Sequence, residues 1–283
     1  MRSVVITGVS TGIGWATAKL LLERGFRVFG SVRKARDAER LHDEFGVNFT
    51  PLLFDVTDEA AVRAAAGKVR EALNGEPLAG LVNNAGIAVG GAVFDLAVSE
   101  FRRQLDVNVM GPFIVTQAFG PLLGADASLR GAKGRIVMVS SVSGKHGNPL
   151  VSAYSASKHA IEGLSEGLRR ELMLFGIDVV IVAPGPVKTP IWDKAEEVDV
   201  SIYRNSPFFP ALEKIRAYML QLAAKGLPAE RIAEVIATAL TTAKPKTRYQ
   251  IVPDPLFQLM VDVLPKRVVD KILAKRLGLS PAA

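Results

Sequence analysis

The chain has 283 residues, 49% of them hydrophobic, a length that suits one α/β domain with a buried core. It has no cysteine, which excludes disulfides and thiolate metal sites, and its three histidines lack the spacing of metal ligands. The net charge is +7, but from Lys244 onward there are eight Lys/Arg against three Asp, so we expect a basic tail and no nucleic-acid partner.

Short runs rich in Val and Ile alternate with longer helical patterns. Because the runs are apolar throughout, they predict strands buried on both faces. The alternation predicts right-handed βαβ units in a parallel, doubly wound α/β sheet, with helices on both faces and residues 1–252 in one domain. The expected strands are 2–7, 27–32, 48–54, 79–83, 134–140, 177–183 and 247–252, and the expected helices are 13–24, 34–44, 58–73, 98–118, 152–175 and 228–242.

The start of the chain and its apolar runs bear on location. The first strand-like run begins at residue 2, which leaves no room for a signal peptide. No apolar run reaches the roughly 18–20 residues of a membrane span. We therefore expect a cytoplasmic protein.

The first strand runs into a glycine-rich turn. Gly8 permits a sharp bend, Gly12 lets a diphosphate approach the backbone, and Gly14 lets the following helix pack closely on the strand. A tight turn with no ligand would use similar glycines, but the position at the first strand–helix junction favours dinucleotide binding. The expected cofactor residues in this turn are Gly8, Ser10, Thr11, Gly12, Ile13 and Gly14.

The second strand ends without the acidic residue that selects the free ribose 2′-hydroxyl of NAD. In its place stand Ser31, Arg33 and Lys34. A guanidinium suits a 2′-phosphate, so these residues predict a preference for NADP(H), with NAD(H) as the second choice. Alternatively, the two basic residues simply begin a solvated helix.

The next two strands also end in polar or small residues. Asp55-Val56 follows the third strand, and the carboxylate either accepts from an adenine amino group or caps the next helix. Asn84, Ala85 and Gly86 follow the fourth strand, where they form either a wall beside a flat ligand or an Asx turn.

Tyr154 and Lys158 lie four residues apart, so both project from one face of a helix. A cation beside a phenol lowers the pKa of the phenol and prepares it for proton transfer to or from a substrate oxygen. Taken alone, such a pair is more often an exposed helix turn.

Together these motifs resemble the short-chain dehydrogenase/reductase family in family order over about residues 1–190. The matching segments are Thr7 to Gly14, Asp55-Val56, Asn83 to Gly86, Asn108, Ser141, Tyr154 to Lys158 and Pro184 to Thr189. The resemblance implies a single-domain Rossmann fold that also binds the substrate.

The resemblance also implies the roles of the catalytic residues. Tyr154 would be the general acid/base, and Lys158 would lower its pKa and hold the nicotinamide ribose. Ser141, 13 residues before Tyr154, would bond the substrate oxygen, with Ser140 and Ser143 as competitors. Asn108 would hold a proton-relay water, although an isolated mid-helix Asn is more often a surface residue or a local kink. The carboxamide of the nicotinamide would be held by the segment containing Pro184, Gly185, Val187 and Thr189.

Two segments depart from the alternation. Residues 186–226 form a long, irregular insertion at the position of the family's substrate lid, and hold aromatics including Trp192 together with Met219. These side chains either line an apolar pocket or form the core of a helical subdomain. Residues 253–283 form a C-terminal extension with two amphipathic stretches separated by Pro265. The basic second stretch either packs on its own domain or a second subunit, or lies on an anionic membrane.

The implied function is interconversion of an alcohol and its ketone or aldehyde with NAD(P). The layout is similar to that of members acting on steroids, retinoids or other lipophilic compounds, and implies a homo-oligomer, dimer or tetramer. The alternatives are a non-catalytic dinucleotide sensor or scaffold, or an epimerase or dehydratase of related fold. The first is disfavoured because Tyr154 and Lys158 are both present.

Overall fold

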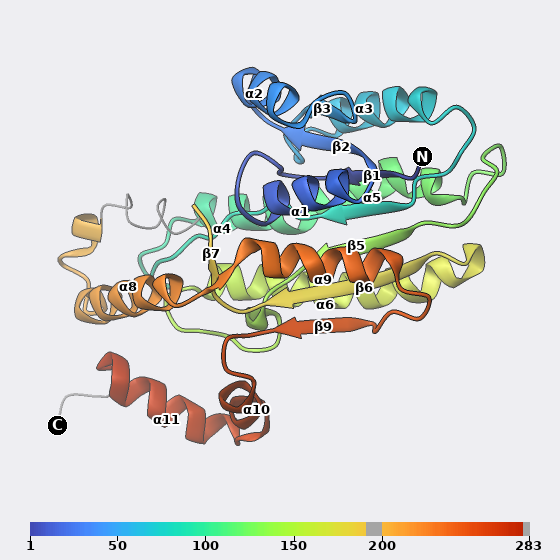
Figure 1. Cartoon of the computed structure of the whole chain (residues 1–283). Coiled ribbons are helices and arrows are strands. Elements are labelled where there is room, and N and C mark those ends of the chain that lie inside the picture. The colour runs from blue at the N-terminus through green and yellow to red at the C-terminus, as the bar shows by residue number, and fades with distance from the viewer. Residues whose placement is uncertain (191–199, 280–283) are drawn as a thin grey trace.

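The structure, a computed structural model, describes residues 1–190 and 200–279. A parallel sheet of seven strands forms its centre, in the order β3-β2-β1-β4-β5-β6-β9 (Figure 1). This confirms the predicted doubly wound sheet. The strands are β1 (Ser3–Ile6), β2 (Arg27–Val32), β3 (Phe49–Leu53), β4 (Gly80–Asn83), β5 (Arg135–Val139), β6 (Asp178–Pro184) and β9 (Arg248–Ile251).

Both faces of the sheet are covered because successive strand residues point to opposite sides. In β1, Val4 and Ile6 pack against one helix layer, whereas Val5 packs against the other. The first layer contains α1 (Gly12–Glu23), α2 (Ala35–Phe45) and α9 (Ala229–Thr241). The second contains α3 (Glu59–Ala72), α5 (Gly111–Phe119) and α6 (Ser152–Glu171).

The strand order reverses between β1 and β4. From β1 the chain moves outward through β2 and β3, then crosses back to place β4 on the other side of β1. The loops that follow β1 and β4 therefore diverge, which opens a crevice at the carboxyl edge of the sheet.

The predicted helix 98–118 is divided in three. It consists of α4 (Val98–Leu105), a π-helical turn η1 (Asp106–Met110) and α5. Pro112 has no N–H to donate to the carbonyl of Asn108, four residues earlier, so a regular α-helix cannot continue through this point. The predicted helix 152–175 likewise ends as α6 and continues as the 3₁₀ turn η4 (Leu172–Phe175).

The insertion 186–226 is more regular than predicted. β7 (Val187–Lys188) pairs in parallel with β8 (Leu227–Pro228), and between them lie the 3₁₀ turn η5 (Val200–Tyr203) and α8 (Phe209–Ala224). Trp192, expected in this insertion, lies outside the described residues.

The C-terminal extension forms two helices separated at Pro265, as predicted. These are α10 (Pro255–Val263) and α11 (Lys266–Leu277), and they lie outside the two layers that cover the sheet (Figure 1). Within the described residues, the helices are too short or too polar to cross a bilayer.

Candidate active site

The glycine-rich turn after β1 is fixed to the end of β4 by two side chains. The Thr7 hydroxyl oxygen accepts hydrogen bonds from the backbone N–H groups of Asn84 and Ala85, at 2.9 and 3.0 Å. The Asn84 side-chain amide donates to the carbonyls of Thr7 and Gly8, at 2.9 and 3.1 Å. Asn84 therefore braces the turn instead of closing an Asx turn. Thr7 begins the motif, but its bracing role could not be read from the sequence.

Two glycines in this turn meet strict steric limits. Gly8 has a φ of +71°, which favours glycine. A Cβ on Gly14 would lie 2.2 Å from the Gly8 carbonyl oxygen, so no other residue fits there without movement. These values match the roles predicted for Gly8 and Gly14.

The N-terminus of α1 is suited to an anion. The helix begins at Gly12, and the preceding Thr11 makes no side-chain capping hydrogen bond to its first turn. The first N–H groups of the helix are therefore available to a diphosphate. A Cβ on Gly12 would lie 3.1 Å from the Thr189 side chain, so the turn and the segment after β6 lie side by side. In this arrangement, the chain fits a dinucleotide across the crevice.

The remaining predicted residues of that segment, Pro184, Gly185 and Val187, line the same edge. Pro184 ends β6, and the Gly185 N–H donates to the carbonyl of Ile251 at 2.8 Å. Val187 is buried in β7. Of the predicted set, Thr189 lies against the glycine-rich turn, while the other three fix the backbone that leads to it.

The segment that follows β2, where the sequence predicted contact with the adenosine, contains an exposed cation. Arg33 lies 3.8 Å from the Asp55 carboxylate, and both side chains face solvent. They border a hollow of about 600 Å³ to which Arg102 and Arg103 of α4 also contribute. Lys34 lies at the start of α2 and is exposed.

Three other predicted residues at this end have internal roles. Ser31 is buried, and its hydroxyl oxygen accepts from the Gly8 N–H at 3.0 Å, so it supports the glycine-rich turn. Asp55 accepts from both the backbone and the hydroxyl of Thr57, at 3.0 and 2.8 Å, as an Asx turn does. Val56 is buried in the core.

Arg40 is a further cation near the turn that sequence reasoning missed. Its guanidinium donates to the carbonyl of Ser10 at 2.8 Å and to Glu44 at 3.0 Å. The arginine on the surface of α2 therefore reaches the glycine-rich turn. Because Arg40 and Ser10 lie 30 residues apart, this contact depends on the fold and not on a local pattern.

The residues predicted to be catalytic lie on α6 and directly after the end of β5. The Lys158 ammonium donates to the Val139 carbonyl at 2.9 Å and lies 5.7 Å from the centre of the Tyr154 ring. Ser141 follows β5, hydrogen-bonds with Tyr154, and accepts from the Ser143 N–H at 3.1 Å. Ser141 therefore both caps the 3₁₀ turn η3 (Val142–Gly144) and contacts the phenol.

The two competing serines do not make the same contact. The Ser140 hydroxyl is buried without a hydrogen-bond partner among the described residues. The Ser143 hydroxyl accepts from the Asn148 amide at 3.4 Å. Ser141 alone of the three is bonded to Tyr154 in the described part of the chain.

Burial dominates the ionisation of the pair. It raises the pKa of Tyr154, and the hydrogen bond with Ser141 offsets only part of that rise. It also lowers the pKa of Lys158 to about 8, although the nearby Glu162 carboxylate opposes the shift. In the chain alone, the phenol pKa is therefore not lowered as the sequence suggested, because loss of hydration outweighs the nearby charges.

Asn108 is buried in the π-helical turn, not exposed. Its side-chain oxygen accepts from the Ile87 N–H at 2.9 Å, and its amide donates to the Ile87 carbonyl at 3.0 Å and to the Ser157 hydroxyl at 3.1 Å. The side chain thus joins the loop after β4 to α6. Gly86 lies next to this side chain, since a Cβ on Gly86 would lie 3.3 Å from the Asn108 side-chain oxygen.

Gln104, one helical turn earlier, is a second side chain that holds the loop after β4, and sequence reasoning missed it. It is fully buried, accepts from the Val89 N–H at 2.7 Å and donates to the Ile87 carbonyl at 2.9 Å. The Ser157 hydroxyl, next to this pair, donates to the Tyr154 carbonyl at 2.7 Å. The spacing of four residues between Gln104 and Asn108 was the available signal.

A doubly wound sheet with a glycine-rich turn at its switch point and a Tyr–Lys–Ser cluster at the same edge is typical of one class of protein. It is the class of nicotinamide-dependent oxidoreductases, in which the protein supplies binding and proton transfer.

Comparison with known proteins identifies the family. Residues 2–199 match the family described as "short chain dehydrogenase". The chain is 37% identical to the NADPH-dependent 3-dehydrocapnine reductase of Ornithobacterium rhinotracheale, over 98% of each chain. It is 32% identical to the bovine (Bos taurus) 17-beta-hydroxysteroid dehydrogenase type 6, over 97% of this chain and 88% of the relative.

Solved structures agree. A short-chain dehydrogenase from Streptomyces avermitilis superposes with a TM-score of 0.75 at 26% identity, covering 97% of this chain and 94% of that one. The chain belongs to the short-chain dehydrogenase/reductase family. It is an oxidoreductase that interconverts an alcohol and a carbonyl compound with a nicotinamide cofactor.

Proposed function

We propose that the protein reduces a lipophilic ketone or aldehyde with NADPH, and that Tyr154 is its general acid. The observation that supports this most strongly is the convergence of Tyr154, Ser141 and Lys158, since Ser141 bonds the phenol and the Lys158 ammonium lies 5.7 Å from its ring. When bound, the reduced nicotinamide supplies the hydride. The Tyr154 hydroxyl gives its proton to the substrate oxygen, and alcohol oxidation is the reverse.

The neighbouring residues prepare that proton transfer. The Ser141 hydroxyl hydrogen-bonds the same substrate oxygen and stabilises the charge that develops there. Lys158 stabilises the phenolate left behind, which burial would otherwise make costly. With a pKa of about 8, Lys158 is mostly protonated at neutral pH and can also return a proton.

Asn108 completes the proton path through its backbone. Its side chain is fully used in bonds to Ile87 and Ser157. Its carbonyl lacks the usual helical donor because that position is Pro112. We propose that this carbonyl holds the water that exchanges protons between Lys158 and solvent.

Arg33 supports the preference for NADPH over NADH. It is exposed beside the hollow at the adenosine end, and its ion-pair partner among the described residues, Asp55, lies at the long distance of 3.8 Å. A 2′-phosphate would offer this guanidinium a closer and more highly charged partner. The reductase from Ornithobacterium rhinotracheale named above is also described as NADPH-dependent.

A lipophilic substrate is supported by the core of the lid. Leu150, which precedes α6, packs with Leu212 and Ile215 of α8, and Tyr203 and Phe208 lie against them partly exposed. This apolar cluster adjoins the segment that leads to Tyr154, so it can form one wall of a substrate site. A 17-beta-hydroxysteroid dehydrogenase among the relatives is consistent with this.

We also propose a cytoplasmic homo-oligomer, a dimer or tetramer. Phe101, Met110 and Phe113 lie on the continuous run from α4 to α5 and are between 37% and 47% exposed. A second copy that covered them would remove these apolar side chains from water. Light scattering of the full chain would measure the assembly directly.

The proposed reaction is tested with a panel of carbonyl compounds. Steroid, retinoid, short aliphatic and small aromatic carbonyls are each assayed with NADPH and with NADH. We expect the highest kcat/KM for a large apolar carbonyl with NADPH. A preference for small polar carbonyls would refute the lipophilic substrate, and turnover of none, despite tight NADPH binding, would favour a sensor.

A further inference from the structure

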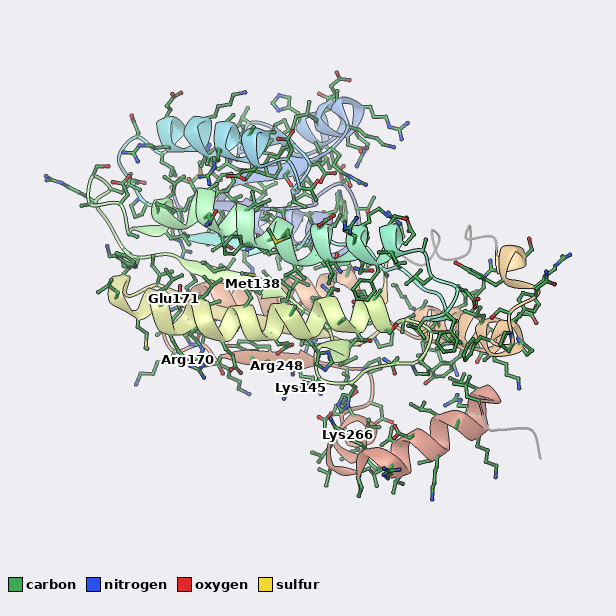
Figure 2. All side chains as sticks on the ribbon, turned by 180° about the vertical axis from the view of Figure 1, so that it is seen from behind. Met138, Lys145, Arg170, Glu171, Arg248 and Lys266 are labelled. Atoms are coloured by element: carbon green, nitrogen blue, oxygen red, sulfur yellow. The ribbon has the colours of Figure 1, made fainter. Side chains whose placement is uncertain are left out.

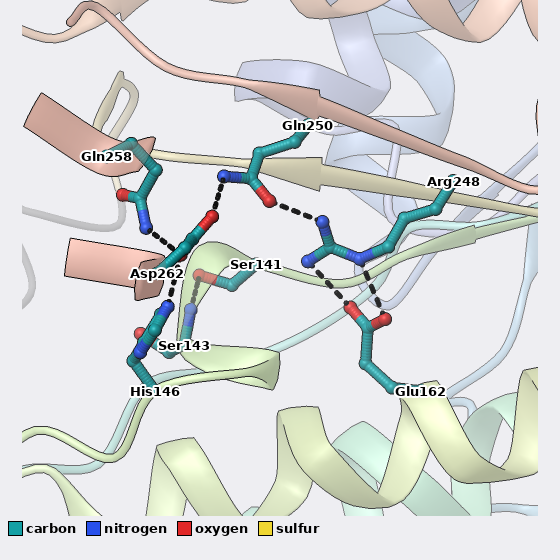
Figure 3. Close-up of polar contacts among 8 residues, drawn as sticks. All are labelled: Ser141, Ser143, His146, Glu162, Arg248, Gln250, Gln258 and Asp262. Carbon is teal, nitrogen blue, oxygen red and sulfur yellow. Dashed lines mark hydrogen bonds and ion pairs between the residues drawn. The ribbon is translucent and has the colours of Figure 1, made fainter. Parts of the chain in front are cut away.

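Helix α10 is attached to the domain by its polar side. Asp262 bonds the His146 ring, and accepts from Gln250 at 3.4 Å and from Gln258 at 2.9 Å (Figure 3). Gln250 in turn accepts from Arg248, which pairs with Glu162 of α6. The polar face of α10 is thereby anchored to β9 and to the loop that follows Ser141.

The apolar side of α10 faces away from the domain. Its residues are spaced at i, i+3, i+4 and i+7, the pattern that normally faces a core, yet they are between 48% and 79% exposed. They are Leu256, Leu259, Met260 and Val263. An ordinary surface helix turns its apolar side toward the core. Helix α10 turns its apolar side toward solvent, which leaves an apolar stripe in water.

Helix α11 extends this surface and adds positive charge. One side is anchored to the lid, since Leu277 is buried against α8 and the Arg276 guanidinium lies 4.1 Å from the centre of the Tyr218 ring. On the other side, Val268 and Ile272 are 41% and 54% exposed. The helix carries five Lys/Arg and one Asp, and Figure 2 shows the first of them, Lys266, on the helical pair that stands off from the main body.

The charge decides between two occupants of this surface. If a second copy met the first through α10 and α11, the strongly basic α11 of each copy would be brought together. An anionic surface would instead neutralise Lys266, Lys271 and Lys275, which are exposed and make no ion pair with any part of the chain that the structure describes.

We propose that α10 and α11 dock the protein on an anionic lipid surface. Leu256, Leu259 and Val263 enter the boundary between headgroups and acyl chains, while the basic residues of α11 contact the headgroups. If the proposed lipophilic substrate is correct, this docking also places the lid helix α8 beside the phase in which such a substrate dissolves.

The test is sedimentation of the full chain with vesicles of equal parts phosphatidylglycerol and phosphatidylcholine, or of phosphatidylcholine alone. We expect binding to the anionic vesicles that falls with added salt, and little binding to the neutral ones. The triple variant Lys266→Gln/Lys271→Gln/Lys275→Gln should weaken binding about a hundredfold. Leu256→Ser/Leu259→Ser/Val263→Ser should also bind poorly.

The matched controls lie elsewhere on the surface. Lys68→Gln on α3 and Val47→Ser, both at exposed positions, should bind vesicles as the natural chain does. The triple variants should keep turnover of a water-soluble carbonyl within about twofold, which shows that they fold.

Two results would overturn the proposal. One is equal sedimentation of the natural chain and the triple lysine variant. The other is loss of self-association in the leucine–valine variant, because it would mean that a second copy covers the apolar stripe. Neither result depends on the identity of the substrate, so a failed carbonyl panel and a failed docking test can be told apart.

Discussion

Replacing Lys158 with methionine should stabilise the folded chain while abolishing its activity. Burial lowers the pKa of Lys158 from 10.5 to about 8. At pH 7 the side chain is charged in both the folded and unfolded states, and the shift corresponds to a cost of about 3 kcal/mol for holding that charge inside. Methionine has a similar shape and no charge.

The hydrogen bond to Val139 reduces the expected gain. Lys158 donates to that carbonyl at 2.9 Å, and leaving the acceptor without this donor costs about 1 kcal/mol. The Lys158→Met variant should therefore be more stable than the natural chain by about 2 kcal/mol. The measurement is urea unfolding at pH 7 without cofactor, with the exposed Lys68→Met as control, which should change stability by less than about 0.5 kcal/mol.

The pH dependence gives an independent check of the same charge. Because the folded pKa lies below the unfolded pKa, the unfolded chain binds more protons between pH 8 and 10.5. The contribution of Lys158 to stability therefore rises with pH across that window and is constant below it. Lys158→Met should remove this rise. A variant that is less stable than the natural chain at pH 7 would refute the reasoning.

Three further predictions concern other residues. Arg33→Ala should weaken NADPH binding by about 10- to 100-fold, as loss of a charged hydrogen bond implies, with NADH affinity little changed; equal losses in fluorescence titrations would exclude the 2′-phosphate contact. Gln104→Ala should lower the free energy of unfolding by about 2 kcal/mol or more, because the buried Val89 N–H loses its acceptor, whereas the exposed Gln221→Ala should have little effect. Partial burial raises the pKa of Asp262, but hydrogen bonds from Gln258, His146 and Gln250 together lower it. The stability from this carboxylate is thus present above its unfolded pKa of 3.8 and lost as pH falls through the lower folded value, so Asp262→Asn should flatten acid unfolding in that window; an unchanged curve would contradict the assignment.

The sheet and the positions of Tyr154, Lys158 and Ser141 at its edge could be predicted because their signals are local. Each strand is a short apolar run, and β1, β4 and β5 each lead into a segment that matches a motif. The spacing of four residues between Tyr154 and Lys158 is enough to predict that both side chains lie on one face of a helix.

The π-helical turn and the bracing side chains could not be predicted in the same way. The predicted helix 98–118 runs through Asn108 without a break, and the bonds from Asn108 and Gln104 to Ile87 join residues about 20 positions apart. Asn84 and Ser31 were correctly placed at the edge of the sheet, yet their bonds to the glycine-rich turn depend on how the strands pair.

The orientation of the C-terminal helices and the ionisation of the site depend on packing. The sequence showed two amphipathic stretches but not that α10 presents its apolar side to solvent. It also suggested a lowered pKa for Tyr154, because proximity to Lys158 can be read from spacing whereas loss of hydration cannot.

The most direct test of Tyr154 as the general acid is a comparison of Tyr154→Phe with the natural chain. Turnover of the best carbonyl from the panel and affinity for NADPH are measured on the same preparation. The loss of one hydroxyl should reduce kcat by at least about a hundredfold, as expected for removal of a general acid, while NADPH affinity stays within about threefold. Undiminished kcat in Tyr154→Phe would contradict the assignment.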